Sequence, residues 1–284
     1  MQLIKSPNSL GGEIQGIDLK KQLNEEQIQF INHSWDERLV LVFKNQNLND
    51  YDLINFSKNF GELDPPGPNP YGITFLPEFP EINVISNVKS NNGVPIGNLG
   101  DGEAVWHADM TYNELPPKAG ILYALEVPEG QGNTHFANMS YAYETLPSPL
   151  KEIINDKILI HDSAHNSAGM LRKGYTESND PSKTPGAKHP LVIKDPNTNK
   201  KLLFLGRRPH AYIIGMEINE SEKLLDKIWQ HATQEKLTWT QKWNVGDLLM
   251  WKNLNVLHKR DSFDPNTRRV MHRTQLKGDT KIAS

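Results

Sequence analysis

The sequence predicts a mainly β (α+β) fold, either a β-sandwich or a jelly roll with helical decoration. Two observations carry this prediction. From residue 104 onward the chain contains many short apolar runs separated by turn residues, as in sheets built from short strands. Helical periodicity clusters near the N-terminus and in one late insertion. Strands alone do not distinguish a jelly roll from other all-β folds. The length of 284 residues fits a single domain over 1–284.

The N-terminal elements are indicated by alternation and by capping residues. Residues 12–19 alternate polar and apolar, as a half-buried strand does. Asn24 followed three residues later by Gln27 is typical of a capped helix start. Residues 39–43 are a short β-branched run typical of a buried strand. Residues 49–60 resemble a second capped helix.

The remaining elements alternate with long loops. Six prolines make 64–80 a loop, and 89–103 is a second one. Residues 163–189 are rich in Ser, Gly, Lys and Pro, and a loop of that length indicates either a functional lid or disorder. We expect helices at 141–154 and 220–235. We expect strands at 82–85, 104–112, 119–127, 133–136, 190–194, 201–205, 211–214, 237–243, 247–251, 255–259 and 268–276.

Composition narrows the function classes. The formal net charge is −3, whereas nucleic-acid binding usually requires a clearly basic face. The chain has no cysteine, which excludes disulfides, zinc fingers, iron–sulfur ligation and thiol catalysis. We see no signal peptide and no apolar segment near the roughly 18 residues of a membrane span. A cytoplasmic protein is expected, with no nucleic-acid or membrane partner.

A metal site is indicated by His107 and Asp109. Residues i and i+2 of a strand point to the same face, so both side chains could bind one ion. A third ligand would complete the two-histidine, one-carboxylate set of non-haem Fe(II) oxygenases. By itself the pair is a weak signal, because a lone strand histidine is more often a packed or surface residue.

The C-terminal segment strengthens the metal prediction. His258 lies in a strand-like run and can supply the second imidazole. Arg269 and Arg273 would face one side of a strand, where two cations suit a dicarboxylate co-substrate. Taken singly, the arginines are better explained as surface charge or internal ion pairs. His272 between them should face the opposite side and be structural.

In this order, the residues resemble the taurine dioxygenase and 2,4-D dioxygenase (TauD/TfdA) family of Fe(II)/2-oxoglutarate oxygenases. The likeness covers nearly the whole chain and includes further landmarks: Gly12–Leu19, Phe60–Leu63, Pro116-Pro117, Lys188–Leu191 and Trp251-x-Asn253. The resemblance implies a double-stranded β-helix (jelly roll). It also implies an oxidoreductase that uses Fe(II), 2-oxoglutarate and O2, oxidises (usually hydroxylates) a small organic substrate, and releases succinate and CO2.

The resemblance also implies roles for individual residues. It assigns iron to His107, Asp109 and His258. Thr134 resembles the family threonine that hydrogen-bonds 2-oxoglutarate, although Asn133 replaces the usual acidic neighbour. Arg269 resembles the residue that pairs with the remote 2-oxoglutarate carboxylate. Arg273 resembles the second arginine, which reaches the substrate anion in sulfonate-oxidising members.

Substrate contacts are predicted at Glu103, Arg207, His210 and Tyr212, in addition to Arg273. Glu103 stands where taurine enzymes have an amide, and 206–212 is expected to border the pocket. A carboxylate and an arginine together suggest a zwitterionic or amino-acid-like substrate. A solvent-facing loop carboxylate is the alternative for Glu103.

Three function classes stay open at this point. The first is the oxygenase, whose outcome could be hydroxylation, desaturation or another oxidative rearrangement. The second is a zinc-dependent hydrolase, because the same ligand set with a water binds zinc. The third is a non-catalytic jelly-roll binding protein. Related enzymes often form dimers or tetramers, so a homo-oligomer is compatible with the resemblance.

Overall fold

The helices lie at both ends of the molecule, and two of them begin where their caps predict. A computed structural model describes residues 1–284 except 68, 70, 103, 280, 283 and 284. The helices are α1 Glu25–Arg38, α2 Asp50–Lys58, α3 Met139–Thr145, α4 Ser148–Ile154 and α5 Ile218–Ala232, with 3-10 turns η1 Pro181–Lys183 and η2 Glu235–Leu237. Asn24 and Asn49 each form a capping box. The helix expected over 141–154 is two helices, because Leu146 precedes Pro147 and is extended.

The largest sheet has eight strands in the order β1-β2-β3-β15-β7-β17-β4-β5. Its pairs are antiparallel except β2–β3 and β4–β5. The strands are β1 Gln2–Lys5, β2 Gly12–Gln15, β3 Val40–Phe43, β4 Asn83–Ser86, β5 Asn98–Leu99, β7 Ala119–Glu126, β15 Leu248–Lys252 and β17 Val270–Leu276.

A second, four-stranded sheet has the order β14-β8-β16-β6. Its strands are β6 Ala104–His107, β8 Thr134–Asn138, β14 Thr238–Gln241 and β16 Val256–Arg260. Two small sheets complete the fold. One contains β9 Ile158–Ile160, β10 Lys188–Pro190 and β13 Tyr212–Ile213, and the other contains β11 Val192–Lys194 and β12 Lys201–Leu203. The short strands β1, β5, β9 and β10 were not predicted.

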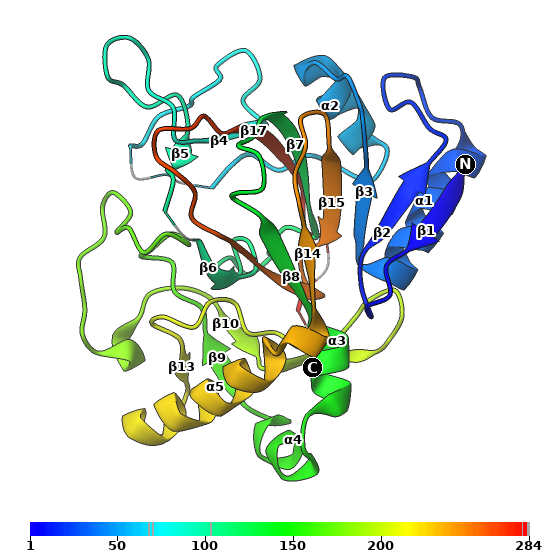
Figure 1. The fold of residues 1–284 in the computed structure, drawn as a ribbon. Helices are drawn as coiled ribbons and strands as arrows, with labels where there is room; N and C mark the ends of the chain where they lie inside the picture. The colour runs from blue at the N-terminus through cyan, green and yellow to red at the C-terminus, as the bar shows by residue number, and fades with distance from the viewer. Residues whose placement is uncertain (68, 70, 103, 280, 283–284) are drawn as a thin grey trace.

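Alternating side chains of the large sheet supply two separate cores. In β7, Ile121 and Tyr123 face α1 and α2, which cover the outer side of the sheet (Figure 1). Leu122 and Ala124 face the other way, onto Phe136 of β8 in the four-stranded sheet. Period-2 patterning thus packs two sheets face to face. The predicted α+β jelly roll with helical decoration is confirmed.

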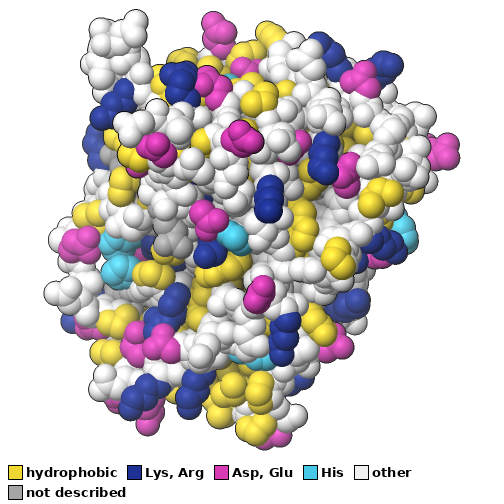
Figure 2. All heavy atoms as spheres, viewed as in Figure 1, with side chains coloured by type: hydrophobic (Ala, Val, Ile, Leu, Met, Phe, Trp, Pro, Cys, Tyr) yellow, Lys and Arg dark blue, Asp and Glu magenta, His cyan; other side chains and the backbone are white. Residues whose placement is uncertain are grey.

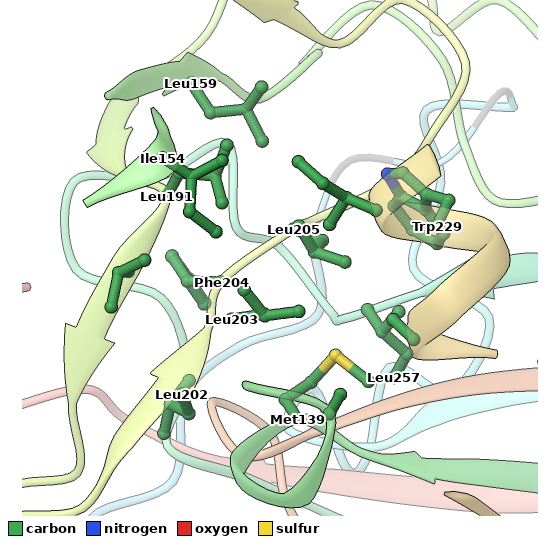
Figure 3. Close-up of a cluster of buried hydrophobic side chains, with 14 of the residues drawn as sticks. Met139, Ile154, Leu159, Leu191, Leu202, Leu203, Phe204, Leu205, Trp229 and Leu257 are labelled. Atoms are coloured by element: carbon green, nitrogen blue, oxygen red, sulfur yellow. The ribbon is translucent and has the colours of Figure 1, made fainter. Parts of the chain in front are cut away.

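A third core lies where α3 and α5 pack on the small sheets. Figure 3 shows Trp229 of α5 directed toward Leu205, with Phe204 and Leu191 on the neighbouring segments. This core fixes the chain on both sides of Arg207. No helix of the described residues is long and apolar enough to cross a membrane. Figure 2 shows acidic and basic side chains interspersed over one face of the molecule.

Candidate metal centre and its pocket

The side chains of His107, Asp109 and His258 form a cluster with ligand atoms within 4.8 Å of one another. The Nε2 atoms of His107 and His258 each lie 3.7 Å from a different oxygen of Asp109. All three residues are less than 10% exposed. The structure therefore brings together the three residues that the sequence singles out, at a separation that one metal ion could bridge.

The two histidines meet because β6 and β16 are paired, with His107 opposite His258 in the register. Their ring centroids lie 4.1 Å apart. The strand expected over 104–112 is wrong in extent, since β6 ends at His107. Asp109 lies in the following turn, where Met110 adopts a φ of 48°. The carboxylate thus reaches the histidines from a turn and not from one face of a strand.

Asn253, in the turn between β15 and β16, fixes the backbone of Asp109. Its side-chain oxygen accepts from the Asp109 N–H at 2.7 Å, and its amide donates to the Asp109 carbonyl at 2.8 Å. The same amide donates to the Pro117 carbonyl at 2.8 Å. Asn253 is completely buried. This residue explains why the sequence landmark Trp251-x-Asn253 accompanies the ligand set.

The electrostatics of the cluster suit a divalent cation. Burial alone would raise the pKa of Asp109, but Arg273, His258 and His107 together lower it well below its usual range. Burial, reinforced by His107, lowers the pKa of His258 to about 3. At neutral pH the site therefore offers an ionised carboxylate and a neutral imidazole, which are the protonation states that bind metal. Two imidazoles and one carboxylate fit Fe(II).

Arg273 lines the pocket, and part of its guanidinium is paired with a candidate iron ligand. Its guanidinium donates to Oδ1 of Asp109 at 2.8 Å, and both side chains are about 10% exposed. The pairing follows from the low dielectric of the site, where an unpaired carboxylate is costly. His272 faces away, as expected, and contacts Asp50 of α2 at 2.6 Å.

Arg269, by contrast, is buried without an acidic partner among the described residues. It is 2% exposed, and its Nε has no hydrogen-bond partner. Burial and the neighbouring Arg260 lower its pKa to about 9. Thr134 lines the same pocket, and its hydroxyl accepts from Trp243 Nε1 at 2.9 Å. A buried, unsatisfied guanidinium beside a fixed hydroxyl is what a carboxylate ligand would complete.

Of the other predicted substrate residues, Arg207 lines the pocket, whereas His210 and Tyr212 do not. Arg207 lines the pocket, but it donates to the Asp162 carboxylate and to the Asn166 carbonyl. His210 is not a lining residue and stacks on His165 at 4.1 Å. Tyr212 is also outside the pocket, because its hydroxyl donates to the Met216 carbonyl. Glu103 lies outside the described residues.

A second group of possible metal ligands comprises Asp162, His165 and His210. The two rings are within 7° of parallel, so their in-plane lone pairs cannot converge on one ion. The Asp162 carboxylate already accepts from Arg207 and contacts His165 Nδ1 at 2.9 Å. We interpret this group as packing that fixes the pocket wall.

One cavity of about 130 Å³ contains the whole constellation. Its described lining includes side chains that the sequence did not single out: Tyr112, Asp162, Asn166, Arg172 and Arg260. Arg172 and Asn166 belong to 163–189, a segment chosen for its length and not for any residue. Arg260 lies two residues after His258 on β16, so same-face spacing could have found it.

Comparisons with known proteins identify the family. The model of the Taurine catabolism dioxygenase TauD, TfdA family matches residues 3–275. The chain belongs to this family. The 2,4-dichlorophenoxyacetate dioxygenase of Cupriavidus pinatubonensis is 29% identical over 95% of both proteins. The (S)-phenoxypropionate/alpha-ketoglutarate-dioxygenase of Sphingobium herbicidovorans is 31% identical, over 87% of this chain and 84% of that protein.

Solved structures agree with this assignment. A TauD-family enzyme, the taurine dioxygenase from Burkholderia xenovorans, superposes with a TM-score of 0.79 at 27% identity, over 99% of this chain and 90% of that one. AAD-2 in complex with Mn(II) and N-oxalylglycine gives 0.78 at 27% identity over all of both chains. Membership in the TauD family decides among the classes left open. The protein is an Fe(II)/2-oxoglutarate-dependent dioxygenase acting on a small organic substrate.

Proposed function

We propose that this TauD-family protein hydroxylates a small organic anion, with iron bound by His107, Asp109 and His258. The donor set, its burial and the protonation states described above support this assignment. When bound, iron and 2-oxoglutarate supply the oxidising chemistry, which consumes O2 and releases succinate and CO2. The chain's own residues bind the reactants, orient them and exclude water.

We assign Arg269 and Thr134 to 2-oxoglutarate. The remote carboxylate of the co-substrate would satisfy the unpartnered guanidinium of Arg269, and the Thr134 hydroxyl can donate because its oxygen already accepts from Trp243. Arg273 is assigned to Asp109 and therefore positions a metal ligand.

The observation that carries the substrate class is the charge of the pocket. The described lining contains two carboxylates, Asp109 and Asp162, and five arginines: Arg172, Arg207, Arg260, Arg269 and Arg273. Five against two leaves an excess of three positive charges among these seven side chains. Fe(II) and dianionic 2-oxoglutarate cancel each other, so the excess remains for the substrate. Buried cations without counter-charge are costly, which favours an anion there.

This charge balance favours an anionic substrate over the zwitterionic one that the sequence suggested. That expectation rested on Arg273, which is paired with Asp109, and on Glu103. Relatives of the chain are named for dichlorophenoxyacetate, phenoxypropionate and sulfate esters, all anionic at neutral pH. Hydroxylation is proposed ahead of desaturation because it is the commonest outcome of this cofactor chemistry.

We further propose that 163–189 forms a lid on a single catalytic domain. The segment contributes four pocket residues: His165, Asn166, Ser167 and Arg172. It is also hydrogen-bonded to the body, for example from the Ala187 N–H to the Tyr112 carbonyl at 3.0 Å. Reduced protease cleavage of this segment when ligands bind is expected, and unchanged cleavage would contradict a lid. A cytoplasmic location and self-association stay predictions.

The test is an anaerobic titration of the apoprotein with Fe(II) and 2-oxoglutarate, followed by the weak visible charge-transfer absorption of the complex. We expect the band in the wild type and in His231→Ala, a control whose ring contacts the Ala142 carbonyl far from the cavity lining. We expect no band in His107→Ala. A wild type that binds iron without developing the band would refute the proposal.

A further inference from the structure

The ring of His107 is held by the backbone of its own strand, β6. Its Nδ1 atom lies 2.7 Å from the Val105 carbonyl oxygen, and a carbonyl can only accept, so Nδ1 carries the proton. The lone pair of the ring is then on Nε2, which faces Asp109. His258 lacks such support, because its Nδ1 is buried without a hydrogen-bond partner among the described residues. The orientation of His107 therefore depends on the position of Val105.

Val105 is in turn fixed by the segment 163–189. β6 is the last strand of its sheet, and one of its edges is paired with β16. On the other edge, the Val105 N–H donates to the Ser167 carbonyl at 3.0 Å. The outer edge of a sheet leaves backbone groups open to such partners. The strand that carries His107 is thus completed by the segment proposed as a lid.

Asn166 sets the conformation of this part of the segment. Its side-chain oxygen accepts from the N–H groups of Ala168 at 3.0 Å and Met170 at 2.9 Å, and its own N–H donates to the Met170 carbonyl at 3.0 Å. Gly169 takes the φ of 77° that the turn requires. These bonds close a tight turn that presents the carbonyl of Ser167 to β6.

A second connection joins the same turn to His107. The guanidinium of Arg207 donates to the Asn166 carbonyl, and the backbone of Arg207 forms an antiparallel bridge with His107. Arg207 also donates to the Asp162 carboxylate, which offsets its charge. The turn at Asn166 is thus linked to His107 through Val105 and through Arg207.

We propose that Asn166 is a positioning residue for iron: its turn orients His107, so that closure of the lid and metal binding favour each other. This inference rests on the proposed function and deepens it, because it gives 163–189 a second role besides excluding water. The turn is a local element that can open while the sheets stay paired. Opening removes the bond to Val105 and lets the His107 ring turn away from Asp109. Metal affinity then falls, and a bound metal opposes the opening to the same extent.

The experiment measures Fe(II) affinity anaerobically and amide hydrogen exchange by mass spectrometry, both without 2-oxoglutarate. Asn166→Ala removes the acceptor of two N–H groups. Its apoprotein should exchange faster over 104–107 and 164–172, while β7 and β15 should exchange like the wild type, which shows that the body stays folded. Fe(II) should bind roughly 10-fold more weakly, the lower end of the loss for residues that orient a metal ligand. Saturating Fe(II) should slow exchange over 164–172 in the wild type.

Two further variants separate positioning from a general loosening of the segment. Asn166→Asp keeps an acceptor oxygen for Ala168 and Met170, and it should restore wild-type exchange and most of the Fe(II) affinity. Asp180→Ala loosens another turn of the same segment, where its carboxylate accepts from the Ser182 N–H at 3.0 Å. This variant should exchange faster over 178–184 and bind Fe(II) like the wild type.

The outcomes distinguish the positioning role from the proposed function. A wild type that binds Fe(II) without the 2-oxoglutarate band refutes the proposed function, and the affinities and exchange rates still test the positioning role. The positioning role alone is refuted if Asn166→Ala exchanges like the wild type over 104–107, or if it binds Fe(II) equally well. It is also refuted if Asp180→Ala weakens Fe(II) binding as much, or if Fe(II) leaves the exchange of 164–172 unchanged. A wild type that binds no Fe(II) refutes both.

Discussion

Replacing Asn253 by alanine should weaken metal binding by an indirect route, since the side chain never reaches the metal. Its two polar ends make three hydrogen bonds of 2.7–2.8 Å, two to the backbone of Asp109 and one to Pro117. The substitution leaves all three backbone groups buried without a partner. The turn that carries the carboxylate is then free to move away from His107 and His258.

The size of the effect follows from the number of bonds. At about 1 kcal/mol of net stability for each bond, the loss is about 3 kcal/mol, and unsatisfied buried groups increase it. Residues that orient a metal ligand typically change metal affinity by roughly 10- to 100-fold when removed. We expect Asn253→Ala to show both losses.

A matched control is available two residues away. Asn255 is 4% exposed and its amide donates to the Asp195 carboxylate, outside the pocket. Asn255→Ala should lose about 2 kcal/mol of stability, the value of a bond to a charged group, and keep its metal affinity. Urea denaturation of the apoproteins and Fe(II) titration measure the two quantities. An Asn253→Ala protein that is less stable but binds Fe(II) like Asn255→Ala would refute the positioning role.

Three further predictions concern single side chains. Arg269→Met should raise the unfolding free energy of the apoprotein, measured in urea, by about 1–4 kcal/mol, because it removes an unpaired buried cation. The same variant should bind 2-oxoglutarate more weakly, and an unchanged affinity would contradict the assignment of Arg269. Trp243→Phe removes the donor to Thr134 and should raise the KM for 2-oxoglutarate several-fold without changing apoprotein metal affinity. Burial keeps the pKa of His161 well below its usual range, so the unfolded chain binds a proton below about pH 6.5 that the folded state does not. The unfolding free energy should therefore decrease as the pH is lowered below about 6.5. His161→Gln should reduce that slope by up to about 1.4 kcal/mol per pH unit, as measured by urea titrations at several pH values.

Local signals and the family resemblance made much of this protein predictable. Asn24 and Asn49 cap their helices as their spacing indicates. The β-branched run at 39–43 and the strand expected at 119–127 form β3 and β7 of the large sheet, where both pair with β15. The three candidate iron ligands form one cluster, although the reason given for Asp109 was incorrect, because β6 ends before it.

Features that depend on long-range pairing were not predictable. Arg273 meets Asp109, 164 residues away in the chain, and nothing near either residue signals that contact. Arg172 is a single arginine in an irregular segment without periodicity. Tyr212 was predicted as a contact because 206–212 was expected to border the pocket, but its hydroxyl donates to the Met216 carbonyl. Sequence spacing indicates which face a residue occupies only within a regular element.

The buried arginines of the pocket differ in whether an acidic side chain offsets their charge, and this difference determines where anions can bind. Arg207 and Arg273 form salt bridges with Asp162 and Asp109, which offset their charges. Arg172, Arg260 and Arg269 form no salt bridge with an acidic side chain of the described residues, so each retains part of the cost of a buried charge until an anion binds. Because the cost is released only by a matching oxyanion, 2-oxoglutarate and substrate should each stabilise the folded protein by mass action. A neutral molecule of the same shape would leave one of these charges uncompensated. Selectivity for anions therefore arises from the cost of the buried charges in the unliganded pocket as much as from contacts in the complex.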